Sequence, residues 1–233
     1  MTRPTRHIGR IVAALRRDYR LGCAPVKLMP ARDPFRVLVS AALSTRTQDP
    51  VTAAAAGRLR RAAPDSAGLA RLRPAIVRKL IFPVGFYRQK ARLLPALGRM
   101  LVENWNGEVP RTMDELLLLP GVGRKVANIV LAKGFGIPAI AVDTHVHRIC
   151  NRLGLVRTKT PEQTERALER FLQKRYWLEW NELLVAHGQT VCRPIGPRCT
   201  ECNINRCCRK VGLRGRRTTA KRAQSGRKVR QGD

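Results

Sequence analysis

Four cysteines near the C-terminus constrain this chain more than any other feature. They lie within one short basic segment and follow the pattern C-x6-C-x2-C-x5-C: Cys192, Cys199, Cys202 and Cys208. Four thiolates this close together form a closed ligand set for one metal centre, either a tetrahedral zinc or an iron–sulfur cluster. The long first spacing favours the cluster, because paired zinc ligands are usually separated by about two to four residues. Cys207 adjoins Cys208, so spacing alone leaves the fourth ligand open, and Cys23 and Cys150 fall in helical patterns that predict small buried side chains.

The balance of charge predicts a polyanionic partner. The chain has 46 Lys and Arg against 16 Asp and Glu, a formal net charge of +30. Residues 211–233 hold eight Lys or Arg and one Asp, net +7, so residues 1–210 still carry +23. A body this basic indicates binding to nucleic acid, and an anionic membrane surface is the weaker alternative.

The sequence also limits where such a chain works. No apolar run approaches the roughly 18 residues of a membrane helix, and no hydrophobic signal core is visible. Together with the metal-binding cysteines, this predicts a reducing, intracellular setting, and we expect a cytoplasmic, nucleoid-associated protein of a prokaryote. The Arg-rich N-terminus superficially resembles a transit peptide. We interpret it instead as an amphipathic helix, because its apolar residues share one face: Ile8, Ile11, Val12, Leu15 and Tyr19.

The remaining sequence predicts helix after helix, so the expected fold class is all-α. Helix starts are marked by N-cap residues or by a proline in the first turn, at Asp33-Pro34, Asp49-Pro50, Pro74, Thr112 and Thr160-Pro161. A long helix is expected from Arg88 toward Trp105, and the helix that opens at Thr160 is expected to reach about Lys174. Gly154 and Gly188 are interpreted as helix stops.

A glycine-rich turn joins two helical segments in LLLLPGVGRKVANIVL. An apolar helix is expected to end at Leu119, the turn Pro120-Gly121-Val122-Gly123 follows, and a second helix begins with Arg124 and Lys125. The glycines allow the backbone to approach another chain closely. The second helix begins with unpaired N–H groups and the positive end of its dipole, an arrangement suited to a phosphate. This pattern predicts a helix-hairpin-helix that contacts a nucleic-acid backbone.

A second segment, AIAVDTHVHRICNRLG, places Asp143 at the start of another helix. The hairpin, the VDTH segment and the four cysteines occur in one order, and together they closely resemble the endonuclease III family of the helix-hairpin-helix superfamily. The segments LSTRTQD at 43–49 and GFYRQKA at 85–91 are also similar to segments of that family. The resemblance covers roughly residues 5–210.

The resemblance implies two helical domains. Residues 27–137 would form a six-helix barrel that contains the hairpin, whereas residues 1–26 and 138–210 would form a domain that holds a 4Fe-4S cluster. Residues 211–233 are expected to be a basic, disordered tail. Double-stranded DNA that contains damaged bases or abasic sites would bind across the cleft between the domains. We expect a monomer with no membrane partner.

The resemblance also implies a bifunctional enzyme of DNA base excision repair. It would be an N-glycosylase that removes oxidised pyrimidines and an AP lyase that cuts 3′ to the abasic site by β-elimination through a lysine Schiff base. The family's nucleophile corresponds to Lys125 and its catalytic aspartate to Asp143. Its cluster ligands correspond to Cys192, Cys199, Cys202 and Cys208, which leaves Cys207 out. The expected DNA contacts are Arg46, Phe86, Tyr87, Pro120, Gly121, Val122, Gly123, Arg124 and His145.

Some positions leave alternatives open. The family commonly has Gln where this chain has Arg46, the residue that would fill the space left by a flipped base, and Arg donates hydrogen bonds but accepts none. Phe86 and Tyr87 are candidates either for a wedge beside the kinked duplex or for ordinary core packing. A monofunctional mismatch glycosylase of the same superfamily is a second reading, although such enzymes usually lack a lysine at the position of Lys125. A non-catalytic DNA-binding protein is a third, and the Lys125/Asp143 pair argues against it.

Overall fold

The computed structural model describes residues 7–19 and 33–213, and this part of the chain contains helices and no strands. The all-α prediction is confirmed. No helix in the described ranges is long and apolar enough to span a membrane. Cys23 and nearly all of the basic tail lie outside the described residues.

The helices are mostly short and follow one another closely. In chain order they are α1 (Ile8–Asp18), α2 (Pro34–Ser44), α3 (Asp49–Ala62), α4 (Ser66–Arg71), α5 (Pro74–Ile81), α6 (Tyr87–Trp105), α7 (Met113–Leu118), α8 (Arg124–Ile129), η2 (Val130–Gly134), α9 (Thr144–Leu153), α10 (Pro161–Glu169), η3 (Lys174–Tyr176), α11 (Trp177–Thr190), η4 (Cys199–Glu201) and η5 (Asn205–Cys207).

Side-chain N-caps are present at Asp33, Thr112 and Thr160, whereas Asp49 is the first residue of α3 and Gln48 is its N-cap. The Asp33 side chain accepts a hydrogen bond from the Arg36 backbone N–H at 3.0 Å. The Thr112 hydroxyl accepts one from the backbone N–H of Glu115 at 3.3 Å, and Thr160 caps α10 in the same way. Each cap satisfies an N–H group that has no partner within its own helix.

Two expected helix ends are wrong. Gly188 does not stop a helix, because it lies inside α11. Its role is a close approach to α9, since a Cβ at Gly188 would lie 2.4 Å from His145 Nδ1. The helix that opens at Thr160 ends at Glu169 rather than near Lys174. The buried Leu172 then turns the chain, and its carbonyl accepts a hydrogen bond from Trp177 Nε1 at 2.8 Å.

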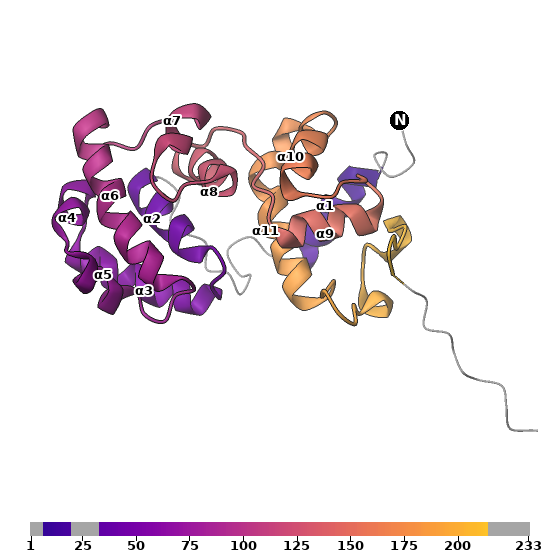
Figure 1. The fold of residues 1–233 in the computed structure, drawn as a ribbon. Coiled ribbons are helices and arrows are strands. Elements are labelled where there is room, and N and C mark those ends of the chain that lie inside the picture. Colours follow the sequence, from indigo (N-terminus) through magenta and orange to yellow (C-terminus); the bar gives the residue numbers. More distant parts are fainter. Residues whose placement is uncertain (1–6, 20–32, 214–233) are drawn as a thin grey trace, which may run out of the picture.

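The buried side chains form two separate hydrophobic cores. The first contains residues between Val37 and Ala139, from α2 through η2 and the chain just beyond it. The second combines residues of α1 with residues from Ile140 to Ile204. Figure 1 shows the corresponding grouping, with α2 to α8 on one side and α1, α9, α10 and α11 on the other. Since α1 packs against α11, the beginning and the end of the described chain meet in the second core.

A buried lysine fixes the end of α2 within the first core. Lys90 is only 8% exposed, and its ammonium donates to the carbonyls of Leu43 at 2.8 Å and Thr45 at 2.7 Å. These carbonyls belong to the last turn of α2, where backbone acceptors have no helical partner. Burial, with a smaller contribution from the charge of Lys125, lowers the pKa of Lys90 to about 8. Lys90 therefore holds the segment after α2, which carries Arg46, against α6.

Helices α4 and α6 approach so closely that only glycine fits at position 98. A Cβ at Gly98 would lie 2.6 Å from the Ala70 backbone nitrogen and 2.9 Å from the Ser66 carbonyl oxygen. Gly98→Ala should therefore lower the free energy of unfolding by roughly 1–3 kcal/mol through overpacking. At this chain length that corresponds to a fall in Tm of about 2–4 °C for each kcal/mol, measurable by thermal denaturation.

The matched control is Gly57→Ala in α3. The nearest atom to a Cβ there is Arg61 Nη1 at 4.0 Å, so the substitution meets no backbone. It should raise the stability by about 0.5–1 kcal/mol, because glycine is unfavourable inside a helix. Equal Tm values for the two variants would contradict the close-packing assignment.

Lys90 should make the stability depend on pH in alkaline solution. Its pKa is about 8 in the folded protein and returns to the ordinary value near 10.5 on unfolding. Between these values the unfolded chain binds more protons, so this residue's contribution to stability increases as the pH rises from 8 to 10.5. Denaturant titrations of the wild type and Lys90→Met across this range measure the effect. A stability difference that does not change with pH would contradict it.

Candidate active site

A cavity of about 600 Å³ lies between the two hydrophobic cores. Its walls come from the segment between α2 and α3, from α8 and η2, from the start of α9, and from α11. Lys125 and Asp143 both line it, Lys125 from a helix of the first core and Asp143 from a helix of the second. The structure thus places Lys125 and Asp143, which lie on elements of different cores, at the same cavity.

Lys125 is the second residue of α8, directly after the hairpin turn. Gly121 in this turn has a positive φ of 78°, and Val122 N–H donates to the carbonyl of Leu119 at 3.1 Å. Gly123, the N-cap of α8, has no side chain to satisfy the first N–H groups of the helix. Val126 is buried in the first core, which orients α8 and leaves the preceding Lys125 at the cavity. The hairpin is therefore formed as the sequence predicted, with the lysine at its second helix.

Asp143 is the N-cap of α9. Its Oδ1 atom accepts hydrogen bonds from the backbone N–H groups of His145 at 2.9 Å and Val146 at 2.8 Å. Both bonds are accepted by one oxygen of the carboxylate. The cap also holds the Asp143 side chain in one orientation, whereas the side chain of an aspartate in a loop without such bonds would not be fixed.

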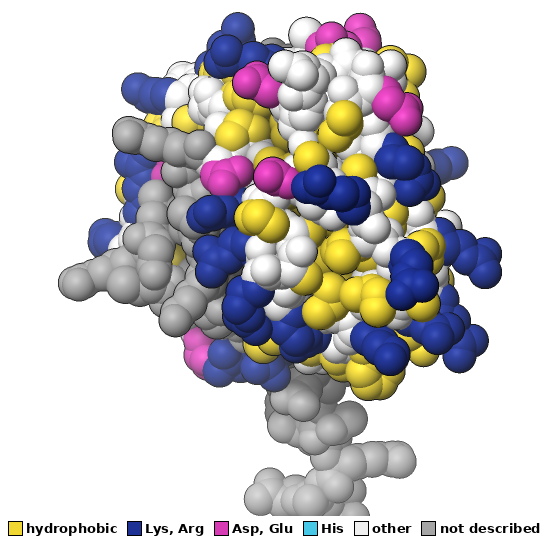
Figure 2. All heavy atoms as spheres, turned by 90° about the vertical axis from the view of Figure 1, so that its left-hand side faces the viewer, with side chains coloured by type: hydrophobic (Ala, Val, Ile, Leu, Met, Phe, Trp, Pro, Cys, Tyr) yellow, Lys and Arg dark blue, Asp and Glu magenta, His cyan; other side chains and the backbone are white. Residues whose placement is uncertain are grey.

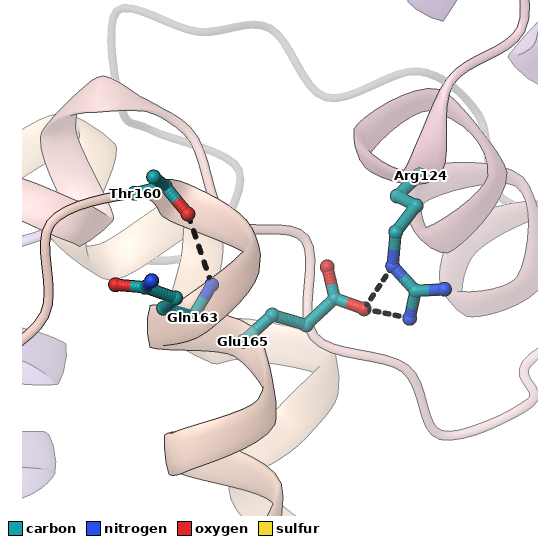
Figure 3. A network of polar contacts seen from close by, with 4 residues as sticks. All are labelled: Arg124, Thr160, Gln163 and Glu165. Atoms are coloured by element: carbon teal, nitrogen blue, oxygen red, sulfur yellow. Dashed lines mark hydrogen bonds and ion pairs between the residues drawn. The ribbon is translucent and has the colours of Figure 1, made fainter.

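Arg124 contacts the opposite half of the molecule. Its guanidinium lies on the Glu165 carboxylate of α10, and the Nε–Oε1 distance is 3.1 Å (Figure 3). The Glu165 side chain is 3% exposed. Figure 3 also shows Thr160, which caps the same helix by accepting from Gln163 N–H at 3.3 Å. The start of α8 is thereby tied to the second core, whereas a direct DNA contact by Arg124 stays a prediction.

Arg46 and Phe86 form a pair at the tips of two neighbouring loops. Both have left-handed backbone conformations, with φ of 52° and 57°, and the Arg46 guanidinium lies 5.4 Å from the Phe86 ring centre. Gly85 permits this approach, because a Cβ there would lie 2.2 Å from the Arg46 carbonyl oxygen. The Phe86 side chain is 56% exposed, so it is not a core residue.

Tyr87 differs from its neighbour. It is partly buried against the first core, and its ring meets Phe82 edge-on with ring centres 5.3 Å apart. The core-packing alternative therefore describes Tyr87, and exposure leaves Phe86 available as a wedge. A second hollow of about 400 Å³ is lined by Arg46, Phe86, Pro120 and Gly121, so the loop pair and the hairpin turn face one space.

His145 also lines the main cavity. Its Nδ1 atom lies 3.2 Å from Arg148 Nη2, and the same guanidinium donates to the carbonyls of Gly188 and Cys192. Burial lowers the pKa of His145, which favours a neutral ring able to accept that bond. Figure 2 shows many Lys and Arg side chains and few acidic ones on the outer face of the first group of helices.

The four cysteines of the C-terminal pattern line one small cavity: Cys192, Cys199, Cys202 and Cys208. Cys207 is not among the lining residues. Polar hydrogens approach two of the sulfurs, since Arg152 Nη1 lies 3.4 Å from Cys192 and the Lys210 backbone N–H 3.3 Å from Cys208. Within the described ranges, no three His, Cys, Asp or Glu side chains converge closely enough to hold a single metal ion.

Several residues of these sites were not found from the sequence. Lys133 of η2 and Glu182 of α11 line the main cavity as an ion pair, and Glu165 anchors Arg124. Lys90, although within the GFYRQKA segment, was not singled out. Each acts through a partner about 40 or more residues away, and no local pattern reports such pairings.

Comparison with known proteins agrees with this geometry. A family model for HhH-GPD superfamily base excision DNA repair proteins matches residues 39–174. Endonuclease III of Thermotoga maritima is 48% identical over 184 residues, which are 79% of this chain and 86% of that protein. Endonuclease III homolog 1 of Arabidopsis thaliana is 40% identical over 81% of this chain, which spans about half of that longer protein (52%).

The solved structure of a trapped endonuclease III–DNA covalent intermediate with an estranged adenine superimposes with a TM-score of 0.80 at 33% identity, covering 88% of this chain and 96% of that one. The resemblance seen in the sequence is confirmed along most of the chain. The chain therefore belongs to the HhH-GPD superfamily of base excision DNA repair proteins and, within it, to the endonuclease III family of DNA glycosylases with AP lyase activity.

Proposed function

We propose that Lys125 is the nucleophile of this glycosylase/lyase, that Asp143 assists it, and that the substrates are oxidised pyrimidines and abasic sites in duplex DNA. The observation that carries the proposal is the position of Lys125 and Asp143 in one cavity, approached from different cores. At about 600 Å³ the cavity is within the usual range for a bound small molecule, and so has room for one extruded nucleotide.

The reaction begins when the damaged nucleotide leaves the stack, because C1′ cannot be reached inside a duplex. The neutral amine of Lys125 attacks C1′, the bond to the base breaks, and the base leaves with the bonding electron pair and gains a proton. Opening of the sugar ring then gives a Schiff base between Nζ and C1′. Loss of a 2′ proton and the 3′ phosphate completes the β-elimination and cuts the strand 3′ to the lesion.

Asp143 supports the step that develops positive charge on the sugar. Its carboxylate is held in one orientation by the two N–H bonds of the α9 cap. Both bonds use Oδ1, so Oδ2 has acceptor capacity for the sugar or for a proton in transfer. A preorganised anion in a cavity shielded from water acts more strongly than one in bulk solvent.

DNA is held by the surfaces that meet at this cavity. The turn at Gly121 and Gly123 presents backbone N–H groups where a phosphate oxygen would accept them. Arg46 and Phe86 stand beside the hollow next to that turn, in position to fill the space vacated by the flipped nucleotide. The net charge of +23 on residues 1–210 supplies the nonspecific attraction to the backbone.

The C-terminal cysteine cavity fits the 4Fe-4S cluster that endonuclease III proteins carry. We assign its ligands to Cys192, Cys199, Cys202 and Cys208, which share one cavity without converging on a single ion position. Burial, with a smaller contribution from the neighbouring cysteines, raises the pKa of Cys202 to about 11, so four thiolates are stable together only around a cation. The cluster would join the segment after α11 to the second core.

Borohydride trapping tests the nucleophile. The wild type should form a stable adduct with a duplex that carries an abasic site or an oxidised pyrimidine, because borohydride reduces the Schiff base to an amine. Lys125→Gln should bind the duplex and give no adduct, and Asp143→Asn should react at least about 100-fold more slowly. Lys79→Gln, which changes an exposed lysine of α5, is the control and should trap normally. Trapping by Lys125→Gln at the wild-type rate would place the nucleophile elsewhere.

Metal analysis tests the cluster. Purified protein should contain about four irons and matching sulfide per chain. Cys208→Ser should lose iron, whereas the adjacent Cys207→Ser should retain it, because only Cys208 lines the cavity. Stoichiometric zinc without sulfide, or equal iron loss in the two variants, would refute the assignment.

A further inference from the structure

The main cavity contains a charged pair that the lysine mechanism does not use. Lys133 of η2 and Glu182 of α11 form an ion pair, and their side chains are 18% and 16% exposed. Both residues line the cavity that also contains Lys125 and Asp143. The pair thus faces the space that an extruded nucleotide would enter.

A contribution to stability does not by itself explain why Lys133 and Glu182 form an ion pair at the cavity. Removing two charges from water costs free energy that their mutual attraction often does no more than offset. Burial lowers the pKa of Lys133 to about 8 even though a carboxylate is its partner. Charged groups kept in a cavity at such a cost are candidates for contact with a ligand.

The other polar side chains of α11 that line the cavity have partners. Asn181 donates its amide N–H to the carbonyl of Ala141 at 2.8 Å, and Gln189 donates to Asp49 Oδ2 at 3.0 Å. Within the described parts of the chain, Lys133 and Glu182 pair with one another, and each has further capacity, since an ammonium has three donors and a carboxylate about four acceptor positions.

A donor next to an acceptor complements the edge of a pyrimidine, where a carbonyl oxygen adjoins a ring N–H. Oxidation at the C5–C6 bond removes the planarity of the ring and weakens stacking, but it leaves the O2, N3–H and O4 edge intact. Charged hydrogen bonds to that edge do not depend on a flat ring, and they are stronger than neutral ones. Such a pair therefore suits a ring-saturated base that an aromatic stack would hold badly.

We propose that Lys133 and Glu182 bind the carbonyl and N–H edge of the extruded pyrimidine and so hold ring-saturated pyrimidines in place for base removal. The ammonium donates to a carbonyl oxygen and the carboxylate accepts from the adjacent N–H. The two residues belong to different cores, so the recognition site is complete only when the cores stand as observed. This inference rests on the proposed lysine mechanism, and it concerns the base rather than the sugar.

The experiment compares two substrates of one enzyme in single-turnover assays. One duplex carries dihydrothymine, whose removal needs base recognition, and the other carries a preformed abasic site, whose cleavage does not. Glu182→Gln and Lys133→Met should each lower the rate of base removal at least about tenfold, because the edge loses a charged partner. Strand cleavage at the abasic site should stay within about threefold of the wild type.

Charge reversal separates recognition from a simple bridge between the cores. The double variant Lys133→Glu/Glu182→Lys can restore the ion pair but presents donor and acceptor in exchanged positions, so dihydrothymine removal should remain low. Glu165→Gln weakens a different bridge between the cores, outside the cavity, and should change both reactions in the same proportion.

Three results would overturn the inference. These are an equal loss of both reactions in Glu182→Gln, no loss of either, or recovery of base removal on charge reversal. Failure of the wild type to cleave the abasic-site duplex would instead refute the proposed lysine mechanism, and the two failures are therefore distinguishable.

Discussion

The arrangement of the active site depends first on the contact of Arg124 with Glu165, which joins the two cores. Arg124 directly precedes Lys125 in α8, whereas Glu165 belongs to α10 and is 3% exposed. Loss of either partner would leave a charge that is buried or poorly solvated, at a cost of about 3–5 kcal/mol for a buried pair. The start of α8, which carries Lys125, is thus held against the half of the molecule that supplies Asp143. The relative position of Lys125 and Asp143 therefore depends on this contact.

The two cores meet mainly through polar contacts around the cavity. Besides Arg124 and Glu165, the ion pair of Lys133 with Glu182 and the hydrogen bond from Gln189 to Asp49 cross between them. Each core buries its own apolar side chains, so separation of the halves would expose little hydrocarbon. Interfaces of this kind allow relative movement of domains more readily than apolar ones.

Local chemistry was predictable from the sequence, and long-range packing was not. The caps at Asp33, Thr112 and Thr160 act within one helical turn, so each capping residue and the N–H group that it binds lie in the same short stretch of sequence. Gly188 was misread because a glycine that stops a helix and one that admits a neighbouring helix look alike in sequence. The two roles are distinguished only by the structure, in which the ring of His145, 43 positions earlier in the chain, lies close to Gly188.

The same division applies to the site. Lys125 and Asp143 were located because each follows a short local motif, and the structure places both in one cavity. No local motif marks Lys90 or Glu182, because the role of each depends on a partner on another helix. Arg46 shows what a local motif leaves out. The sequence shows that Arg stands where the family usually has Gln, but it does not show the strained φ of 52° or the position of the guanidinium over the Phe86 ring. Strain of this kind costs about 1–3 kcal/mol and persists only where the surroundings impose it. Gly85 permits the close approach of the Arg46 backbone, so this loop conformation depends on contacts with the start of α6 that no local pattern around Arg46 reports.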